Sequence, residues 1–303
     1  MNNTVPVFFA SDKNYLPCLS VAIKSLLANI SRENNYHIYV LTPDITQEQL
    51  MEDFEIIPGN VQIKAVNINN KIDTIKKNAQ LRDYYSLSIY SRLFIPEMFP
   101  QYDKVVYLDC DVIVNTDIAK MHQINIGNNF LGCVLDKAVV NSPEFIEYVI
   151  KHIGCDNDKQ YFNSGVLLMN NTRCRQSGML QAFYDWLLQN NSTVAPDQDF
   201  LNVYCKNQVT YLPAGWDEMP IANKLNDKDL FIIHFNMFSK PWKYKGVMYE
   251  DYFWKHAKDS KYHDDFIKQR DAYTQEQKQA DMQAMLALLE NALNIARKYD
   301  KLS

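Results

Sequence analysis

Short runs of β-prone residues alternate with stretches of helical apolar spacing along the first third of the chain. The strand-like runs are residues 5–10 (VPVFFA), 36–41 (YHIYVL), 61–66 (VQIKAV) and 104–108 (KVVYL). Helical spacing of apolar residues falls between them, at 16–27, 46–54 and 86–99. This alternation predicts an α/β fold with a mainly parallel sheet flanked by helices.

The second half of the chain is more mixed. Strand-like runs fall at 130–135, 161–169, 209–212 and 230–234. Helical spacing is found at 143–153, 180–188 and 198–204. The sequence contains no internal repeat and no Pro/Ser-rich linker. We therefore expect one domain over residues 1–250, followed by a helical tail over residues 251–303.

The tail carries one strong helix signal. Thr274-Gln-Glu-Gln277 has the form of a capping box. Apolar residues follow at helical spacing, among them Met282, Met285, Leu289, Ala292 and Ala296. A helix of this kind must bury a face, either on its own domain or on a second subunit. We favour a homodimer through this helix, with intramolecular packing as the alternative.

Charge and glycine content exclude several binding classes. Lys and Arg number 31 against 36 Asp and Glu, so the net charge is −5 and the footprint of a nucleic-acid binder is absent. None of the eight glycines contributes to a G-x-G-x-x-G or a G-K-[ST] motif. The usual dinucleotide fingerprint and the P-loop are therefore excluded. Any phosphate site in this chain must use other groups.

Cysteine spacing and the N-terminal residues bear on the compartment. The six cysteines include no C-x-x-C pair, which argues against a zinc knuckle and a thioredoxin motif. The N-terminal residues lack the basic and apolar regions of a signal peptide. No apolar run approaches the roughly 18 residues of a membrane span. We expect free thiols, no transmembrane segment and a cytoplasmic location, with peripheral attachment to the inner membrane face left open.

Two aspartates follow directly on a strand without polar alternation. Asp109 and Asp111 come after the apolar run 104–108, and an extended backbone points both side chains to one face. Ligands of open α/β sheets bind at the carboxyl ends of such strands. Adjacent carboxylates repel each other unless a cation lies between them, and hard divalent cations prefer such oxygens. A solvated pair of loop aspartates is the alternative.

A histidine closes another apolar strand. His234 follows residues 230–233, and Lys240 stands six residues later, beside Pro241 and Trp242. An imidazole together with two carboxylates suits Mn²⁺ better than Mg²⁺. Lysine binds phosphate as a point charge. These residues could hold a diphosphate and its metal, although His234 alone would more often be a hydrogen-bonded core residue.

Three further segments carry polar side chains at strand ends or helix starts. Residues 9–15 (FASDKNY) suit a nucleoside site with Tyr15 stacking on the base and Asp12 reading it, or simply a helix start capped by Asp12 or Asn14. Residues 161–170 (YFNSGVLLMN) and 196–199 (PDQD) are the other two. Acids at the start of a helix are favoured by the helix dipole alone.

The combination of these motifs resembles the family 8 retaining glycosyltransferases. It is most similar to the bacterial members that add galactose or glucose to lipopolysaccharide or related glycans. The motifs extend from Phe9 to Trp242, over most of the chain. In order they are F-A-S-D-x-N-Y, Y-S-R-L, Y-L-D-C-D, Y-F-N-S-G-V-L-L-M-N, D-Q-D and H-x-x-x-x-x-K-P-W.

This resemblance implies a GT-A fold and a retaining transfer of glucose or galactose from a UDP-sugar to a glycan or glycolipid hydroxyl. It implies Mn²⁺, or Mg²⁺ in its place, bound by Asp109, Asp111 and His234. The implied donor-binding residues are Ala10, Ser11, Asp12, Asn14, Tyr15, Arg92, Asp109, Cys110, Asp111, Asn163, Ser164 and Lys240. The implied catalytic residues are Gln198 and Asp197 beside the sugar and Asp136 on the acceptor side.

The chain departs from the family pattern at two places. Met237 stands where the family has a glycine in H-x-x-G-x-x-K-P-W, and Tyr84-Tyr85 suggest an aromatic acceptor site. No carboxylate is set aside as a nucleophile, although Asp197 or Asp199 could be proposed. The family favours attack by the acceptor hydroxyl on the face from which UDP leaves, with the departing phosphate oxygen taking the proton.

Two other functions remain open from the residues. V-V-Y-L-D-C-D-V also resembles the first motif of aspartate-nucleophile phosphatases, in which the first aspartate attacks phosphate. That motif usually lies near the start of its domain, whereas Asp109 follows three strand–helix units. A non-catalytic UDP-sugar-binding protein is the second alternative, suggested by Met237.

Overall fold

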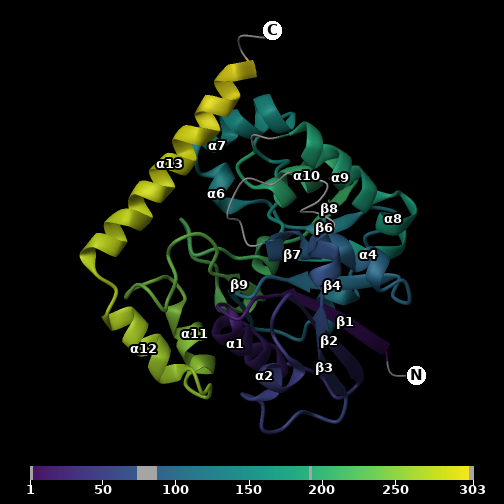
Figure 1. Cartoon of the computed structure of the whole chain (residues 1–303), viewed down its shortest axis with the longest axis vertical. Helices are drawn as coiled ribbons and strands as arrows, with labels where there is room; N and C mark the ends of the chain where they lie inside the picture. Colours follow the sequence, from purple (N-terminus) through teal and green to yellow (C-terminus); the bar gives the residue numbers. More distant parts are fainter. Residues whose placement is uncertain (1–2, 74–86, 191–192, 300–303) are drawn as a thin grey trace.

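The computed structural model describes residues 3–73, 87–190 and 193–299. A seven-stranded sheet with strand order β3-β2-β1-β4-β7-β6-β8 forms its centre (Figure 1). The pairs β1–β2, β2–β3, β1–β4 and β6–β8 are parallel, whereas β7 is antiparallel to β4 and β6. The strands are β1 (Asn3–Ala10), β2 (Asn34–Thr42), β3 (Val61–Asn67), β4 (Lys104–Leu108), β6 (Leu131–Cys133), β7 (Val166–Asn170) and β8 (Val209–Tyr211). The prediction of a mainly parallel α/β sheet is confirmed.

Helices cover both faces of this sheet (Figure 1). Those of the first half are α1 (Leu16–Leu27), α2 (Gln47–Met51), α4 (Ile95–Met98), α5 (Ala119–His122), α6 (Lys137–Val140) and α7 (Pro143–Tyr148), which continues into a π-helical turn, Val149–Ile153. Those of the second half are α8 (Asn171–Gln176), α9 (Met179–Gln189), α10 (Pro196–Tyr204), α11 (Glu250–Ala257), α12 (His263–Asp271) and α13 (Gln275–Tyr299). Short 3₁₀ helices lie at Ala214–Trp216 and Asp227–Asp229.

Two expected elements are interrupted in the structure. From residue 87 on, the helix expected over 86–99 is a 3₁₀ helix, Leu87–Phe94, followed by α4. Pro96 explains the restart, because it lacks the N–H of an α-helical bond and suits the first turn of a new helix. The strand expected over 161–169 begins only at Val166. Before it, the Asn163 side chain accepts a hydrogen bond from the Gly165 backbone N–H at 2.7 Å and turns the chain.

Strand register brings three chain segments together at one edge of the sheet. β1 and β4 pair with Phe9 opposite Leu108, so residues 10–12 and 109–111 leave the sheet at the same level. A second, two-stranded sheet pairs β5 (Val112–Val114) with β9 (Ile232–His234), and Val112 lies opposite His234. The carboxyl ends of β1, β4 and β9 therefore converge, at the position where open α/β sheets bind ligands.

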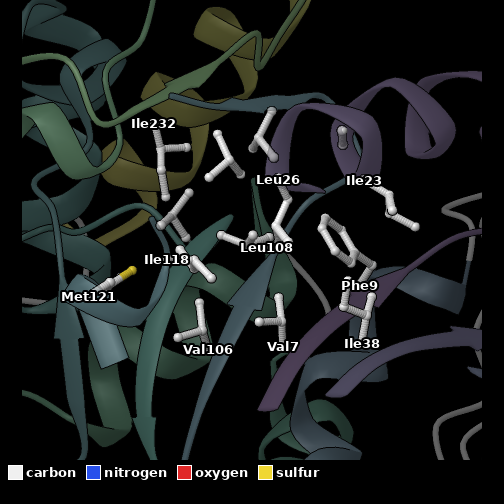
Figure 2. Close-up of a cluster of buried hydrophobic side chains, with 14 of the residues drawn as sticks. Val7, Phe9, Ile23, Leu26, Ile38, Val106, Leu108, Ile118, Met121 and Ile232 are labelled. Carbon is white, nitrogen blue, oxygen red and sulfur yellow. The ribbon is translucent and has the colours of Figure 1, made fainter. Parts of the chain in front are cut away.

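The sheet is buried on both faces. Figure 2 shows one apolar cluster, in which side chains of β1, β2 and β4 meet those of α1 and of the segments around α5 and β9: Val7, Phe9, Ile38, Val106, Leu108, Ile23, Leu26, Ile118, Met121 and Ile232. On the opposite face, Phe8 and Tyr107 belong to a second cluster with Phe183 of α9 and Phe200 of α10. Burial on both faces explains why these strands show no polar alternation.

The segment after residue 250 packs in two different ways. Phe253 of α11 and Phe266 of α12 stack around Trp242, with ring centroids 5.0 Å and 6.1 Å from it, in one cluster with β5 and β9. α13 lies along the outside and packs its last turns, through Ala292 and Ile295, on α7 (Figure 1). A domain boundary at residue 250 stays a prediction. Within the described ranges, no helix is both long and apolar enough to span a bilayer.

Candidate functional site

A cavity of about 280 Å³ opens at the carboxyl ends of β1 and β4. Its lining contains residues from three of the predicted motifs: Ala10, Ser11, Asp12, Tyr15, Ile89, Arg92, Tyr107, Asp109, Cys110 and Asp111. Asn14 is not among them. Tyr84 and Tyr85 lie outside the described residues.

Asp109, Asp111 and His234 form one cluster beside this cavity. One ligand atom from each lies within 4.8 Å of the others. His234 Nε2 is 3.2 Å from Asp111 Oδ1 and 3.9 Å from Asp109 Oδ2. Pairing of β5 with β9 fixes this arrangement, since the Phe235 N–H donates to the Asp111 carbonyl at 2.9 Å. Two carboxylates and an imidazole at these separations fit a single divalent cation such as Mn²⁺.

Asp217 fixes the other side of the histidine ring. His234 Nδ1 and Asp217 Oδ1 are 2.8 Å apart, and both side chains are buried. Burial alone lowers the pKa of His234, but the carboxylates of Asp217 and Asp111 outweigh it and raise the pKa to about 10. Sequence reasoning missed Asp217, because it follows a short 3₁₀ helix with no periodic signal.

Asp109 is held by three neighbours. Its Oδ1 accepts hydrogen bonds from the Tyr107 hydroxyl at 2.7 Å and from Arg92 Nη2 at 3.0 Å. Its backbone N–H donates to the Gly165 carbonyl at 2.7 Å. Gly165 lies against two of the three metal-ligand candidates, and a β-carbon there would overlap the His234 ring and come 2.7 Å from Asp109 Oδ2. Tyr107 and Gly165 thus support the cluster without contributing ligand atoms.

Lys240 contacts the same cluster from the loop after β9. Its ammonium forms an ion pair with Asp111 and donates to the Phe235 carbonyl, and it lies 5.7 Å from the Trp242 ring. Burial raises the pKa of Asp111, but Lys240 and His234 outweigh burial and hold that pKa below its usual value. Met237, at the family's glycine position, has a φ of 60°, so it adopts the left-handed conformation that glycine accepts most readily.

Arg92 joins the metal-ligand cluster to the segments expected to face the sugar. Besides Asp109, its guanidinium donates to the Ser164 carbonyl, to Ser164 Oγ at 2.8 Å and to Asp197 Oδ2 at 3.2 Å. The Arg92 side chain is almost fully buried. The planar fork of a guanidinium is suited to bridging several acceptors in this way. Burial raises the pKa of Asp197, although the charge of Arg92 opposes this effect.

Gln198 is held at both ends of its amide. Its Oε1 accepts from the Ser164 backbone N–H at 2.9 Å, and its Nε2 donates to Asp136 Oδ2 at 2.8 Å. Asp136 also accepts from Asn163 Nδ2 at 3.2 Å and caps the N-terminus of α6. The structure therefore brings together all five residues expected near the sugar and the acceptor: Asp136, Asn163, Ser164, Asp197 and Gln198.

Asp199, two residues after Asp197, has a different environment. Its two oxygens accept hydrogen bonds from the hydroxyls of Tyr148 and Tyr161, each at 2.6 Å, and from the N–H groups of Val194 and Ala195. The carboxylate is fully buried, and burial raises its pKa to about 6. These contacts do not favour Asp199 as a nucleophile, since all of them are interior contacts that join α10 to α7, to Tyr161 and to the two residues before α10.

The segment after β1 differs from the expected helix start, because Tyr15, and not Asp12 or Asn14, is the N-cap residue of α1, with no side-chain cap among the described residues. Asp12 Oδ1 accepts from the N–H groups of Asn14 at 2.9 Å and Tyr15 at 3.1 Å, which forms a turn before the helix. Tyr15 remains 44% exposed at the cavity wall. Cys110 is buried below it and donates to the Ala10 carbonyl at 2.9 Å. The hydrogen bonds of Asp12 therefore orient this segment while the ring of Tyr15 stays partly accessible.

Comparison with known proteins decides the family. Residues 6–246 match the model of Glycosyl transferase family 8. The chain belongs to glycosyl transferase family 8. The matched residues include every site residue described above. The expected family and fold class are confirmed.

Family 8 relatives with sequence similarity include both short and long proteins. A putative glycosyltransferase of Haemophilus influenzae is 27% identical, covering 76% of this chain and 66% of the relative. Glycosyltransferase GlyD of Streptococcus pneumoniae is 27% identical, covering 84% of this chain but 30% of the relative. The lipopolysaccharide 1,2-glucosyltransferase of Escherichia coli is 24% identical, covering 82% of this chain and 78% of the relative. The chain thus spans less than two-thirds of the first two relatives.

Two solved structures of glycosyltransferases share the fold. The bifunctional glycosyltransferase WbbM has a TM-score of 0.75 at 23% identity, covering 90% of this chain and 52% of its own. The galactosyltransferase LgtC, solved with donor and acceptor sugar analogs, has a TM-score of 0.69 at 26% identity. The match covers 85% of this chain and 96% of LgtC. The mainly parallel sheet flanked by helices is therefore a glycosyltransferase architecture.

Proposed function

We propose that this family 8 chain transfers glucose or galactose from a UDP-sugar to a hydroxyl of a glycan or glycolipid, with retention of configuration and with Mn²⁺. The observation that carries the proposal is the continuous set of contacts from His234 and Asp111 through Asp109 and Arg92 to Asp197. This set supports the proposal because a divalent cation bound by these ligands would lie beside polar groups suited to a sugar.

Positive charge is concentrated where a diphosphate would leave. A divalent cation held by Asp109, Asp111 and His234 would supply Lewis-acid stabilisation of the leaving UDP. Lys240 adds a second positive charge from this chain itself, and two of its three N–H donors already have acceptors. The remaining donor is free to bind a phosphate oxygen, which would stabilise the charge that develops there.

The sugar would lie between Arg92 and Gln198. Arg92 holds Asp197, and Ser164 together with Asp136 holds the Gln198 amide, so these side chains are ordered before a ligand arrives. Positioned groups of this kind orient an acceptor hydroxyl for attack on the sugar. In the mechanism we favour, that hydroxyl attacks from the face that UDP leaves, and its proton passes to the departing phosphate oxygen.

The nucleoside would lie against the segment after β1. Tyr15 offers an exposed ring for stacking on uracil, and Asp12 leaves Oδ2 available to accept from the base while Oδ1 accepts from the Asn14 and Tyr15 N–H groups. The acceptor class is supported by one relative, whose name describes it as a lipopolysaccharide glucosyltransferase. Asp136, next to Gln198, is the residue we propose on the acceptor side.

Thermal stability and hydrolysis of UDP-sugars together test this function. UDP with Mn²⁺ should raise the Tm of the full chain, since a ligand that binds only the native state stabilises it. GDP with Mn²⁺ should raise it much less, and exhaustive chelation should remove the UDP effect. A panel of UDP-sugars should then show Mn²⁺-dependent hydrolysis with UDP-glucose or UDP-galactose. Equal shifts with UDP and GDP, or phosphatase activity without UDP dependence, would overturn the proposal.

We also propose that α13 pairs two copies of the chain. The support is its apolar stripe, on which Met282 and Leu286 are 65% and 59% exposed. Both lie on the part of α13 that precedes its contacts with α7. Large apolar side chains at this exposure are more often covered by a partner when they lie in one row.

A further inference from the structure

His234 forms a buried pair with Asp217, a residue that lies outside all of the motifs described above. Their contact, His234 Nδ1 to Asp217 Oδ1 at 2.8 Å, lies on the ring edge opposite the one that faces Asp111. The Asp217 side chain is fully buried, and its second oxygen, Oδ2, has no hydrogen-bond partner among the described residues. A buried carboxylate with an unused oxygen is costly unless a cation compensates it.

The backbone holds this pair in place. Residues 217–218 run beside β9: the His234 N–H donates to the Glu218 carbonyl, and the Glu218 N–H donates to the Ile232 carbonyl, each at 2.9 Å. Asp217 itself closes the 3₁₀ helix Ala214–Trp216 by donating its N–H to Ala214. Asp217 is therefore fixed relative to His234 by main-chain bonds, and its side chain has little freedom to take another partner.

The neighbouring acid shows what a purely structural carboxylate looks like here. Glu218 is also buried, but its Oε1 accepts from Lys137 Nζ at 2.7 Å and from the Tyr249 hydroxyl at 2.9 Å. These partners satisfy its charge without His234 or either aspartate of the metal-ligand cluster. Of the two adjacent acids, Glu218 therefore contacts Lys137 and Tyr249, whereas Asp217 contacts His234.

We infer that Asp217 is a positioning residue that orients His234 for a divalent cation. By accepting the Nδ1–H, it leaves the Nε2 lone pair directed at the space between Asp109 and Asp111. Carboxylate partners of this kind fix the ring orientation and increase the basicity of a metal-binding histidine. The inference rests on the cation site of the proposed function but not on the identity of the donor sugar.

Titration of the full chain with Mn²⁺ tests this role, with free Mn²⁺ followed by electron paramagnetic resonance. Asp217→Asn keeps an acceptor oxygen and loses the charge, so Mn²⁺ affinity should fall about 10-fold; Asp217→Leu loses both, and the fall should approach 100-fold. Glu218→Gln removes a buried charge one residue away and should leave affinity within about twofold, because the hydrogen bonds of its side chain go to Lys137 and Tyr249 and not to a ligand residue.

A double-mutant cycle separates positioning from a general effect on folding. In a His234→Gln background, Asp217→Asn should change Mn²⁺ affinity by less than about twofold, since the residue it acts through is gone. Additive effects in that cycle, or Asp217→Asn with wild-type affinity, would overturn the inference even if Asp217→Leu failed to fold. A wild-type chain that bound Mn²⁺ but not UDP would refute only the proposed donor, and one that bound no Mn²⁺ would refute both.

Discussion

Gly165 lies against His234 so closely that a β-carbon at position 165 would overlap the imidazole ring. The φ angle of Gly165 is not in the left-handed region, so the backbone itself would accept alanine. Gly165→Ala should therefore act by displacing His234 and Asp109, and it should weaken Mn²⁺ binding by at least about 10-fold. Isothermal titration of Mn²⁺ checks this.

Gly59 provides the matched control for this substitution. A β-carbon there meets nothing within 4 Å, and its φ is likewise outside the left-handed region. Gly59→Ala should leave Mn²⁺ binding unchanged. If Gly165→Ala folds and binds Mn²⁺ as the Gly59 variant does, the cluster tolerates a larger neighbour and our account of its packing is wrong.

Gln198→Ala should reduce turnover far more than UDP affinity. The Gln198 amide is fixed between Ser164 and Asp136, away from the segment proposed for uridine. We expect turnover to fall by about 100-fold, the scale of one lost positioned group, with UDP affinity changed by less than about threefold. Initial rates and UDP titration on the same protein separate the two quantities, and parallel losses would indicate that Gln198 only builds the pocket.

Met237→Gly should stabilise the chain slightly. A non-glycine residue at a φ of 60° costs roughly 1–2 kcal/mol, whereas the extra freedom of glycine in the unfolded chain costs roughly 0.5–1 kcal/mol. The free energy of unfolding should therefore rise by up to about 1 kcal/mol. Met237→Val should lower it, because a β-branched side chain tolerates this conformation poorly. Urea denaturation of both variants measures the difference, and a Met237→Gly variant less stable than wild type would contradict the argument.

Asp199 should make the chain less stable as pH rises from about 4 to 6. Its pKa is about 6 in the folded chain, above the ordinary 3.8, so the folded state holds the proton more tightly. The stabilisation is complete below pH 3.8 and is lost as pH rises through 6. Asp199→Asn cannot ionise, so the difference in unfolding free energy between wild type and variant should change over this range. A difference that stays constant between pH 4.5 and 7 would show that the Asp199 pKa is ordinary.

Met282→Gln combined with Leu286→Gln should separate the proposed dimer. Both side chains are largely exposed, so their replacement should leave the Tm of a monomer unchanged. Light scattering after gel filtration should give about twice 35.4 kDa for wild type and 35.4 kDa for the variant. A wild-type mass of 35.4 kDa would refute the dimer directly.

Sequence patterns predicted the parts of the fold that depend on local composition. The strand 104–108 coincides with β4, and the meeting of Asp109, Asp111 and His234 is confirmed. Both follow from apolar strands that end in polar residues, where the carboxyl ends of strands in open α/β sheets bind ligands. The same reasoning extends to Arg92 and Ser164 only through the family motifs, because nothing in their local sequence says which acceptors a buried guanidinium will meet.

The residues that were missed share a physical cause. Asp217 reaches His234 because the chain after a 3₁₀ helix runs beside β9, a long-range pairing with no local signal. In the sequence, Tyr107 is one more apolar residue of a strand, but its hydroxyl donates a hydrogen bond to Asp109, two residues later. Pro96 falls inside the helix expected over 86–99, where the helical spacing of apolar residues masked the change from 3₁₀ to α-helical geometry. Roles of the individual site residues in catalysis stay predictions.

The enclosure of Arg92 bears on how donor preference could diverge within this scaffold. Ser164, Asp109 and Asp197 all contact this one guanidinium, so replacing it would remove several hydrogen bonds of the site at once. Ile89 and Tyr15 line the same cavity, their side chains form no such hydrogen bonds with the residues that the structure describes, and Tyr15 is 44% exposed. Substitutions at these two positions can change the shape of the cavity without breaking the contacts of Arg92. Substitutions that alter ligand preference are therefore expected at cavity positions such as Ile89 and Tyr15, while Arg92 and its acceptors stay the same.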